Sequence, residues 1–153
     1  MSGKRIFELP LGYTLRTINE DDYDKGIFDV LSQLTLAPKI SKEQFTLIIN
    51  NQNIEYYVIV HVKSNKVVAC ANLYLEQKLI RGGGIVGHLE EVVVDYKHQG
   101  KALGVILCEK IKTRAKEVGC YKLIGYCKPS LLEYYKKIGF EGGSDCFSLY
   151  FDN

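Results

Sequence analysis

The chain has 153 residues, of which 46% are hydrophobic and 25% are charged, and its formal net charge is +2. This length and balance are typical of one globular domain with a single core, so we expect residues 1–153 to form one domain. The small net charge gives no support for a nucleic-acid partner. No uncharged apolar run approaches the ~20 residues of a membrane span, so none is expected.

Five cysteines and three histidines are scattered through the sequence. The cysteine count is odd and no pair has the C-x-x-C spacing, which favours reduced thiols over disulfides and predicts a cytoplasmic location. The histidines lack the spacing of a metal-binding motif, so we expect no metal. Residues 1–13 contain no apolar stretch of the kind found in secretory signals.

The first part of the chain predicts a strand followed by two helices. Residues 13–18 alternate between apolar and polar positions, as a half-buried strand does. The acidic run at 20–22 is typical of a helix start, and an apolar stripe continues this helix to about Leu34. Ser41 is expected to cap a second helix, which ends near Ile49.

The middle of the chain predicts three strands. Two β-rich runs, 56–62 and 66–75, flank a short turn at 64–65 and indicate a hairpin. Glycines at 82–84 form a flexible connection. The apolar run at 88–94 is the next strand.

The remaining elements alternate between helix and strand. Apolar residues at helical spacing predict a helix over 103–118, and Gly119 is well placed to end it. A short strand is expected at 122–127 and a helix at 129–139, which Pro129 begins. The apolar run at 146–151 is the last strand. The order predicts a mixed sheet with helices on its faces.

The stretch from residue 89 to residue 104, LEEVVVDYKHQGKALG, carries the strongest functional signal. A β-branched run passes through a short loop of small and polar residues into an amphipathic helix. Backbone N–H groups at such a helix start converge on one point and suit a pyrophosphate. A simple packing turn is the alternative. The residues expected to bind a phosphorylated cofactor are Gln99, Gly100, Lys101, Ala102, Leu103 and Gly104.

Two adjacent carboxylates, Glu90 and Glu91, lie on the strand before this loop. Because neighbouring residues of a strand point to opposite faces of the sheet, only one side chain is expected to enter the site. A carboxylate there, directly or through water, can accept a proton from an attacking amine. We expect Glu91 to lie nearer the amine and Glu90 to contact substrate or an interface. The alternative is a pair of solvated charges.

Four segments resemble the GNAT-type N-acetyltransferases. They are the G-H-L-E-E-V-V-V strand at 87–94, the Q-G-K-A-L-G loop at 99–104, the G-C-Y-K segment at 119–122 and the Y-Y-K-K-I-G-F segment at 134–140. The distance of G-C-Y-K from G-H-L-E-E is similar to that in the amino-sugar branch of the family. The resemblance implies an α/β fold with a mostly antiparallel mixed sheet, splayed at two central strands, and helices on both faces.

The resemblance also implies the activity and the cofactor. Acetyl-CoA would bind without a metal, and its acetyl group would pass directly to the amine of D-glucosamine 6-phosphate in a ternary complex. The pantetheine arm would lie between the splayed strands along Val92, Val93 and Val94, where a backbone N–H polarises the thioester carbonyl. Tyr135 would donate to the departing thiolate, and core packing is the alternative for this aromatic residue.

A homodimer with the site near its interface is implied as well. The apolar C-terminal residues 147–151 are candidates for pairing across that interface, or for completing the sheet of a monomer. Lysine neutralises a phosphate as a point charge. The residues implied to bind the acceptor are Thr35, Gln77, Lys78, Leu79, Ile80, Leu89, Glu90, Glu91, Lys122 and Tyr126.

Four departures from the family pattern keep two alternatives open. Ala102 replaces the first glycine of the signature loop, Tyr126 replaces an acidic residue, Leu131 replaces an asparagine, and the final residues SLYFDN lack the basic residue that the resemblance leads us to expect near the substrate phosphate. The first alternative is a GNAT enzyme for another amine, such as a peptide or polyamine. The second is a domain that binds acyl-CoA without catalysis.

Overall fold

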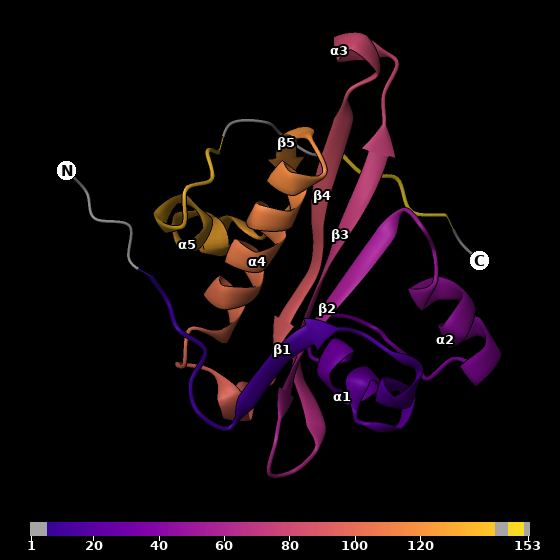
Figure 1. Ribbon diagram of the computed structural model, residues 1–153, viewed down its shortest axis with the longest axis vertical. Coiled ribbons are helices and arrows are strands. Elements are labelled where there is room, and N and C mark those ends of the chain that lie inside the picture. Colours follow the sequence, from indigo (N-terminus) through magenta and orange to yellow (C-terminus); the bar gives the residue numbers. More distant parts are fainter. Residues whose placement is uncertain (1–5, 143–146, 152–153) are drawn as a thin grey trace.

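The structure, a computed structural model, describes residues 6–142 and 147–151. Its described strands form one mixed sheet in the order β1-β2-β3-β4-β5 (Figure 1). Neighbouring strands are antiparallel except β4 and β5, which are parallel. The strands are β1 (Tyr13–Thr17), β2 (Ile54–His61), β3 (Lys66–Gln77), β4 (Ile85–Val94) and β5 (Cys120–Ile124).

Helices cover both faces of this sheet, with α4 and α5 on one face and α1 and α2 on the other (Figure 1). The α-helices are α1 (Ile27–Leu31), α2 (Lys42–Ile49), α3 (Ile80–Gly83), α4 (Leu103–Glu117) and α5 (Leu132–Lys137). Three short 3-10 turns are η1 (Glu20–Asp24), η2 (Tyr96–His98) and η3 (Pro129–Leu131). No helix of the described residues is long and apolar enough to cross a membrane.

Each face of the sheet has its own hydrophobic core. On one face α4 buries the stripe Leu103, Leu107, Ile111 and Ala115, whose spacing of four places them on one side of the helix. On the other face, α1 and α2 pack apolar side chains against β2 and β3. Full burial of one such leucine stabilises the fold by roughly 1.5–3 kcal/mol. Because this stripe starts at Leu103, the first residue of α4, its burial holds the start of the helix against the sheet.

The helix predicted over residues 20–34 is wrong, because the chain breaks it at Gly26. This glycine adopts φ +82, a left-handed conformation that interrupts the helix. Before the break lies the 3-10 turn η1, which Asn19 and Asp22 close with a reciprocal capping box. Asp22 is fully buried and is bound at 2.7 Å by each of two Arg16 nitrogens, which compensates its charge.

The last part of the predicted sheet also differs. The strand expected at 122–127 is β5, which begins at Cys120 and ends at Ile124. The strand expected at 146–151 is absent from its described part, 147–151, and Cys146 lies outside the described residues. Without that strand β5 forms an edge of the described sheet, rather than one of two central strands.

The remaining predicted elements are confirmed with small shifts of their ends. Ser41 accepts a hydrogen bond from the Gln44 backbone N–H at the start of α2. The connection expected to be flexible at 82–84 contains the short turn α3, in which Arg81 has φ 56. The glycines expected to end α4 and α5, Gly119 and Gly139, both adopt the left-handed conformation.

We predict that Leu107→Ala lowers the free energy of unfolding by about 2–5 kcal/mol, because Leu107 is fully buried between α4 and the sheet. Chemical denaturation at constant m-value measures this loss. Leu47→Ala on α2 is the matched control, since Leu47 is 76% exposed and its truncation is expected to cost less than about 0.5 kcal/mol. Equal losses in the two variants would contradict this packing.

Candidate functional site

Strands β4 and β5 pair over only part of their length and then diverge. Their pairing runs from Ile85 opposite Cys120 to His88 opposite Ile124, whereas β4 continues to Val94. At Gly125, just past β5, an added Cβ would lie 3.0 Å from the Leu89 carbonyl oxygen, so the backbones of the two segments are still close there. The next residue, Tyr126, is 62% exposed. The last half of β4 therefore presents backbone groups that β5 does not use.

A bulge in β4 lies at the start of this unpaired half. Asn72 of β3 is opposite Glu90, and Cys70 is opposite Val93, so β4 has one more residue between these pairs than β3 has. The extra residue is Glu91, whose φ of 53 is left-handed. The expectation that Glu90 and Glu91 point to opposite faces is therefore wrong, because regular alternation stops at the bulge.

Both carboxylates instead lie on the sheet face that α1 and α2 cover. Glu90 is there because it is opposite Asn72, and Glu91 is there because its Oε2 accepts a hydrogen bond from Asn72 Nδ2 at 2.9 Å. Burial raises the pKa of Glu90, and the negative charge of Glu91 adds to this, while His88 opposes it. A carboxylate with a raised pKa is a better proton acceptor than an ordinary one, which suits a general base.

The loop from Gln99 to Gly104 leads into the N-terminus of α4, at the end of β4. Gln99 and Gly100 are exposed, and Gly100 has φ +80 with open space around it. Ala102 is the N-cap of α4 with φ 60 and makes no side-chain capping bond. The first turn of α4 contains no acidic residue, so its free N–H groups and positive dipole end are not neutralised within the helix. Such an end binds anions.

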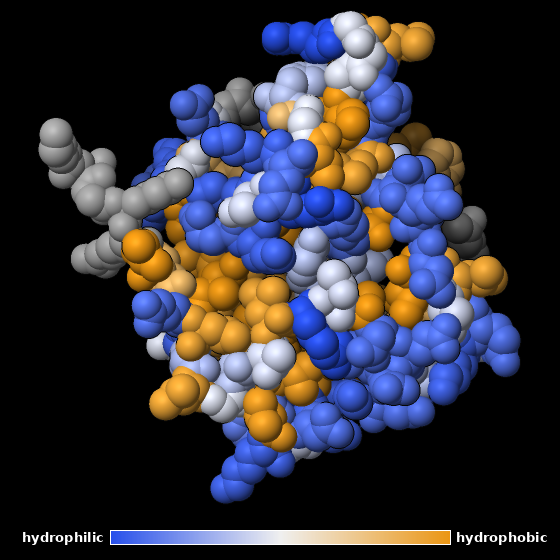
Figure 2. Space-filling model, viewed as in Figure 1, coloured by the Kyte–Doolittle hydropathy of each residue, from blue (hydrophilic) through white to orange (hydrophobic). Residues whose placement is uncertain are grey.

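Around the start of α4, apolar side chains gather on the surface seen in Figure 2. They adjoin the ends of β4 and α4, where Val94 and Ala102 are only half-buried against the core. The candidate anion site at the start of α4 therefore borders an apolar surface, an arrangement that suits a ligand with both a phosphorylated part and an apolar arm.

Two neighbouring tyrosines of α5, Tyr134 and Tyr135, make different contacts. An added Cβ at Gly104 would lie 2.9 Å from the Tyr134 hydroxyl oxygen, so this hydroxyl rests against the start of α4. Tyr135 packs edge-to-face on Phe140, with ring centroids 5.9 Å apart. Burial raises the pKa of Tyr135 to about 12, with further contributions from Cys108 and Cys127, which keeps its phenol protonated at neutral pH. Sequence analysis missed Tyr134.

The residues expected to bind the acceptor are spread over the chain rather than gathered in one place. Leu89 and the two carboxylates lie on the second half of β4, while residues 77–80 lie at the far tip of the β3–β4 hairpin (Figure 1). Lys122 is exposed and its Nζ lies 5.7 Å from the centre of the Tyr121 ring. Thr35 is exposed in the connection between α1 and α2.

At the hairpin tip, local contacts already engage the polar side chains. Gln77 donates a hydrogen bond to the Gly83 carbonyl oxygen, and Lys78 forms an ion pair with Glu76. Leu79 is fully exposed and Ile80 is 63% exposed. Within one subunit the described structure therefore does not bring the tip next to the carboxylates of β4.

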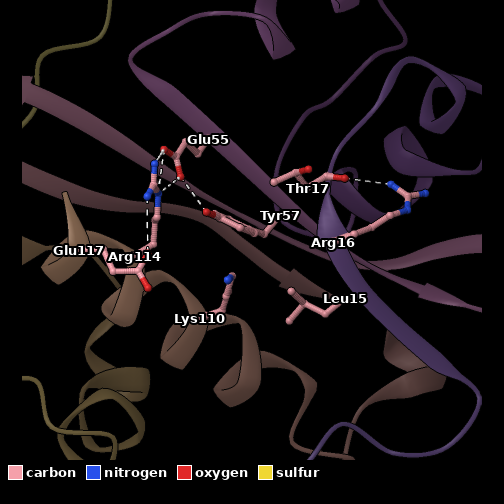
Figure 3. A pocket seen from close by; sticks show the side chains of 8 residues that line it. All are labelled: Leu15, Arg16, Thr17, Glu55, Tyr57, Lys110, Arg114 and Glu117. Atoms are coloured by element: carbon pink, nitrogen blue, oxygen red, sulfur yellow. Dashed lines mark hydrogen bonds and ion pairs between the residues drawn. The ribbon is translucent and has the colours of Figure 1, made fainter.

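The hollow shown in Figure 3 lies elsewhere, between β1, β2 and α4. Arg114 of α4 binds Glu55 of β2 at 2.9 Å, and the Tyr57 hydroxyl donates to the same carboxylate at 2.7 Å (Figure 3). These groups satisfy one another, and none of them comes from β4 or from the loop at 99–104. We therefore attribute a structural role to this ion pair.

The described residues contain no group of three or more histidine, cysteine or acidic side chains that could hold a metal ion. Cys70, Cys108, Cys120 and Cys127 are all free thiols. The pKa of Cys70 and Cys108 is raised by burial, and neither has the exposed, electropositive surroundings of a reactive cysteine.

Comparison with known proteins identifies the fold and the family. The sequence model of the acetyltransferase (GNAT) family matches residues 16–140. The chain belongs to this family. A glucosamine 6-phosphate N-acetyltransferase from Dictyostelium discoideum is 40% identical over 144 residues, which cover 91% of each protein. The Candida albicans enzyme of the same name is 38% identical, and the match covers 88% of this chain and 93% of that protein.

A solved structure agrees with these sequence matches. The crystal structure of glucosamine-6-phosphate N-acetyltransferase from Arabidopsis thaliana superposes with a TM-score of 0.87 at 32% identity, covering 92% of this chain and 99% of that chain. This confirms the expected GNAT fold and the expected branch of the family. GNAT acetyltransferases use acetyl-CoA.

We predict that Ala102→Gly raises the free energy of unfolding by about 0.5–1 kcal/mol, because a glycine adopts the left-handed N-cap conformation without the cost that a Cβ brings. Affinity for CoA, measured by calorimetry, is expected to stay within twofold, since the backbone N–H groups are retained. Gly100→Ala is the opposite control, because it introduces a Cβ at φ +80 and should destabilise the protein by about 1 kcal/mol. A destabilised Ala102→Gly variant would contradict the assigned conformation.

Proposed function

We propose that this GNAT protein transfers the acetyl group of acetyl-CoA to the amine of D-glucosamine 6-phosphate, giving N-acetyl-D-glucosamine 6-phosphate and CoA. The divergence of β4 from β5 beside the free N-terminus of α4 carries this proposal, because it joins a strand with unused backbone groups to an anion site. The relatives that match nearly the whole chain are named for this reaction. The free thiols support a cytoplasmic location.

The cofactor would be held mainly by the backbone. The N–H groups of residues 99–104 and of the first turn of α4 would bind its pyrophosphate, and no metal is required for this. The pantetheine arm would extend along Val92, Val93 and Val94 on the side of β4 that β5 leaves unpaired. A backbone N–H of Val92 or Val93 would then donate to the thioester carbonyl oxygen and stabilise the negative charge that develops there.

Proton transfer would involve the carboxylates of β4. The attacking amine must lose a proton to form the amide, and a neighbouring carboxylate, directly or through water, can take it. Glu90 has the raised pKa that suits this role, and Glu91 lies beside it on the same face. The sequence-based preference for Glu91 stays a prediction, and the bulge makes both carboxylates available to one acceptor.

Departure of CoA would be assisted by Tyr135. The sulfur carries negative charge as the carbon–sulfur bond breaks, and the Tyr135 phenol is protonated at neutral pH because burial raises its pKa to about 12. The Tyr134 hydroxyl lies near the start of α4 and is the other candidate donor.

The acceptor site is proposed to be completed in a homodimer. Lys122 and Thr35 would contact the sugar phosphate together with Leu89 and Tyr126, whereas residues 77–80 are too far along the hairpin to serve the same subunit. The hairpin tip would reach the partner's site instead. The tail residues Leu149, Tyr150 and Phe151, which are 78–91% exposed, would be covered by the second copy.

The direct test is release of CoA from acetyl-CoA, followed with a thiol reagent, with glucosamine 6-phosphate as the acceptor. We expect saturable turnover that exceeds turnover with glucosamine, a polyamine or a lysine peptide by at least about 100-fold. Peptides and polyamines are included because Tyr126 replaces the acidic residue expected from the family resemblance. Preference for one of them would overturn the proposed substrate. Binding of acetyl-CoA without turnover of any acceptor would indicate a domain without catalysis.

We predict that the kcat/KM of the parent enzyme rises with pH through a midpoint above the ordinary pKa of a glutamate, because Glu90 accepts a proton only when ionised and burial raises its pKa. Glu90→Gln is expected to lose about 100-fold in kcat and to abolish this acidic limb. Glu91→Gln is the matched control at the neighbouring position. If Glu91→Gln rather than Glu90→Gln removes the limb, the two roles are exchanged.

We predict that Tyr135→Phe lowers kcat by about 10- to 100-fold while the Kd of CoA changes less than twofold, because only the donated proton is lost. Tyr134→Phe removes the neighbouring hydroxyl and is expected to change kcat less than threefold. Rapid-quench and steady-state rates measure both. A loss confined to Tyr134→Phe would assign the proton to Tyr134.

A further inference from the structure

The bulge at Glu91 is held by a buried side chain on the neighbouring strand. Asn72 of β3 is 4% exposed, and Asp22 is the other buried polar residue of the described chain. A buried amide is costly unless it is hydrogen-bonded, and the Asn72 amide donates to Glu91 Oε2 at 2.9 Å. The Asn72 amide thus binds Glu91, the bulge residue of β4.

Glu91 needs such support because its backbone conformation is unfavourable. A φ of 53 places its Cβ close to the following carbonyl group, and only glycine adopts this conformation readily. Its side chain is exposed, so apolar packing does not hold it in place. The hydrogen bond from Asn72 ties the side chain of Glu91 back to β3 and so opposes a return to regular extended backbone.

A second strand reinforces this arrangement. Tyr56 of β2 is opposite Asn72, and Asn72 is opposite Glu90, so these three residues form one row across β2, β3 and β4 on the same face. The phenol of Tyr56 lies beside Glu91: burial first, and then the charge of Glu91, raises the pKa of Tyr56. His88, Tyr56 and Cys70 are the other titratable groups that interact with the two carboxylates.

The bulge decides which way the rest of β4 faces. Beyond it, Val92 and Val94 pack toward the α4 core and Val93 packs toward the α1–α2 core. Removing the extra residue from the pairing would shift the register by one and turn each valine to the other face. The backbone N–H groups of Val92 and Val93 would turn with them.

We infer that Asn72 is a positioning residue for acyl transfer, which acts through Glu91 by holding the β4 bulge that aims the following backbone N–H groups at the thioester. The inference rests on the proposed function for the role of those N–H groups. The contacts that hold the bulge do not depend on the proposed function.

A double-mutant cycle tests this role with Asn72→Leu, Glu91→Gly and the combined variant. Glycine adopts the left-handed conformation without help, so Asn72 should matter only when residue 91 is glutamate. We expect Asn72→Leu to lower kcat at least about tenfold in the parent but less than twofold in the Glu91→Gly background. The Kd of CoA should change less than kcat in all variants, because the loop at 99–104, which is proposed to hold the pyrophosphate, is left unaltered.

Thermal midpoints provide a readout without turnover. We expect Asn72→Leu to lower the midpoint in the parent, and to leave it unchanged or raise it in the Glu91→Gly background, where the buried Asn72 amide has lost its acceptor. Asn72→Ala replaces Asn72→Leu if the leucine variant does not fold. Equal effects of the substitution in both backgrounds, on midpoint and on kcat, would show that Asn72 only fills space and would overturn the inference. A parent that does not acetylate glucosamine 6-phosphate overturns the proposed function instead, and the thermal cycle still decides the role of Asn72.

Discussion

Unequal pairing of one strand is the constraint on which this structure depends. Strand β4 is paired with β3 along nearly its whole length, and with β5 only from Ile85 to His88. An unpaired backbone N–H must find another partner, and a ligand that runs alongside the strand can supply it. The helix α4 begins after the loop that follows β4. Strand β4 and the start of α4 therefore offer two sets of backbone donors, separated by residues 95–98, whose N–H groups are hydrogen-bonded within the protein.

Side-chain chemistry is added to this backbone frame from three elements. The bulge brings Glu90 and Glu91 to one face of β4, Asn72 on β3 binds Glu91, and α5 places the Tyr134 hydroxyl at the start of α4. The absence of acidic residues from the first turn of α4 leaves its dipole free to act on an anion. Each of these features is local, but all depend on the register between β3 and β4.

Sequence patterns were sufficient for the elements with strong periodicity. The α4 helix, its closing glycine, the capped start of α2 and the loop at 99–104 follow from residue spacing and from local capping chemistry. The family resemblance supplied the branch and the substrate class, which the relatives bear out. The site residues themselves stay predictions, since homologue names do not assign roles to individual side chains.

The errors come from tertiary interactions that periodicity does not encode. The helix at 20–34 breaks because Asp22 is buried with Arg16 and Gly26 is left-handed. The β4 bulge is invisible in the run of valines, although Asn72 within the apolar run at 67–75 signals a buried polar contact. Tyr134 was missed because adjacent tyrosines are distinguished only by packing. The final strand was expected from composition alone, and residues 147–151 do not form it.

The parallel pairing of β4 with β5 also affects where the sheet unfolds locally. Strand β5 reaches β4 only after the 15-residue helix α4, and it holds four paired positions at the sheet edge. Such a non-local and short attachment gains little until the rest of the sheet is in place. The amide hydrogens of β5 should therefore exchange faster than those of β3. A cofactor bound between β4 and β5 would slow the exchange in β5 by mass action.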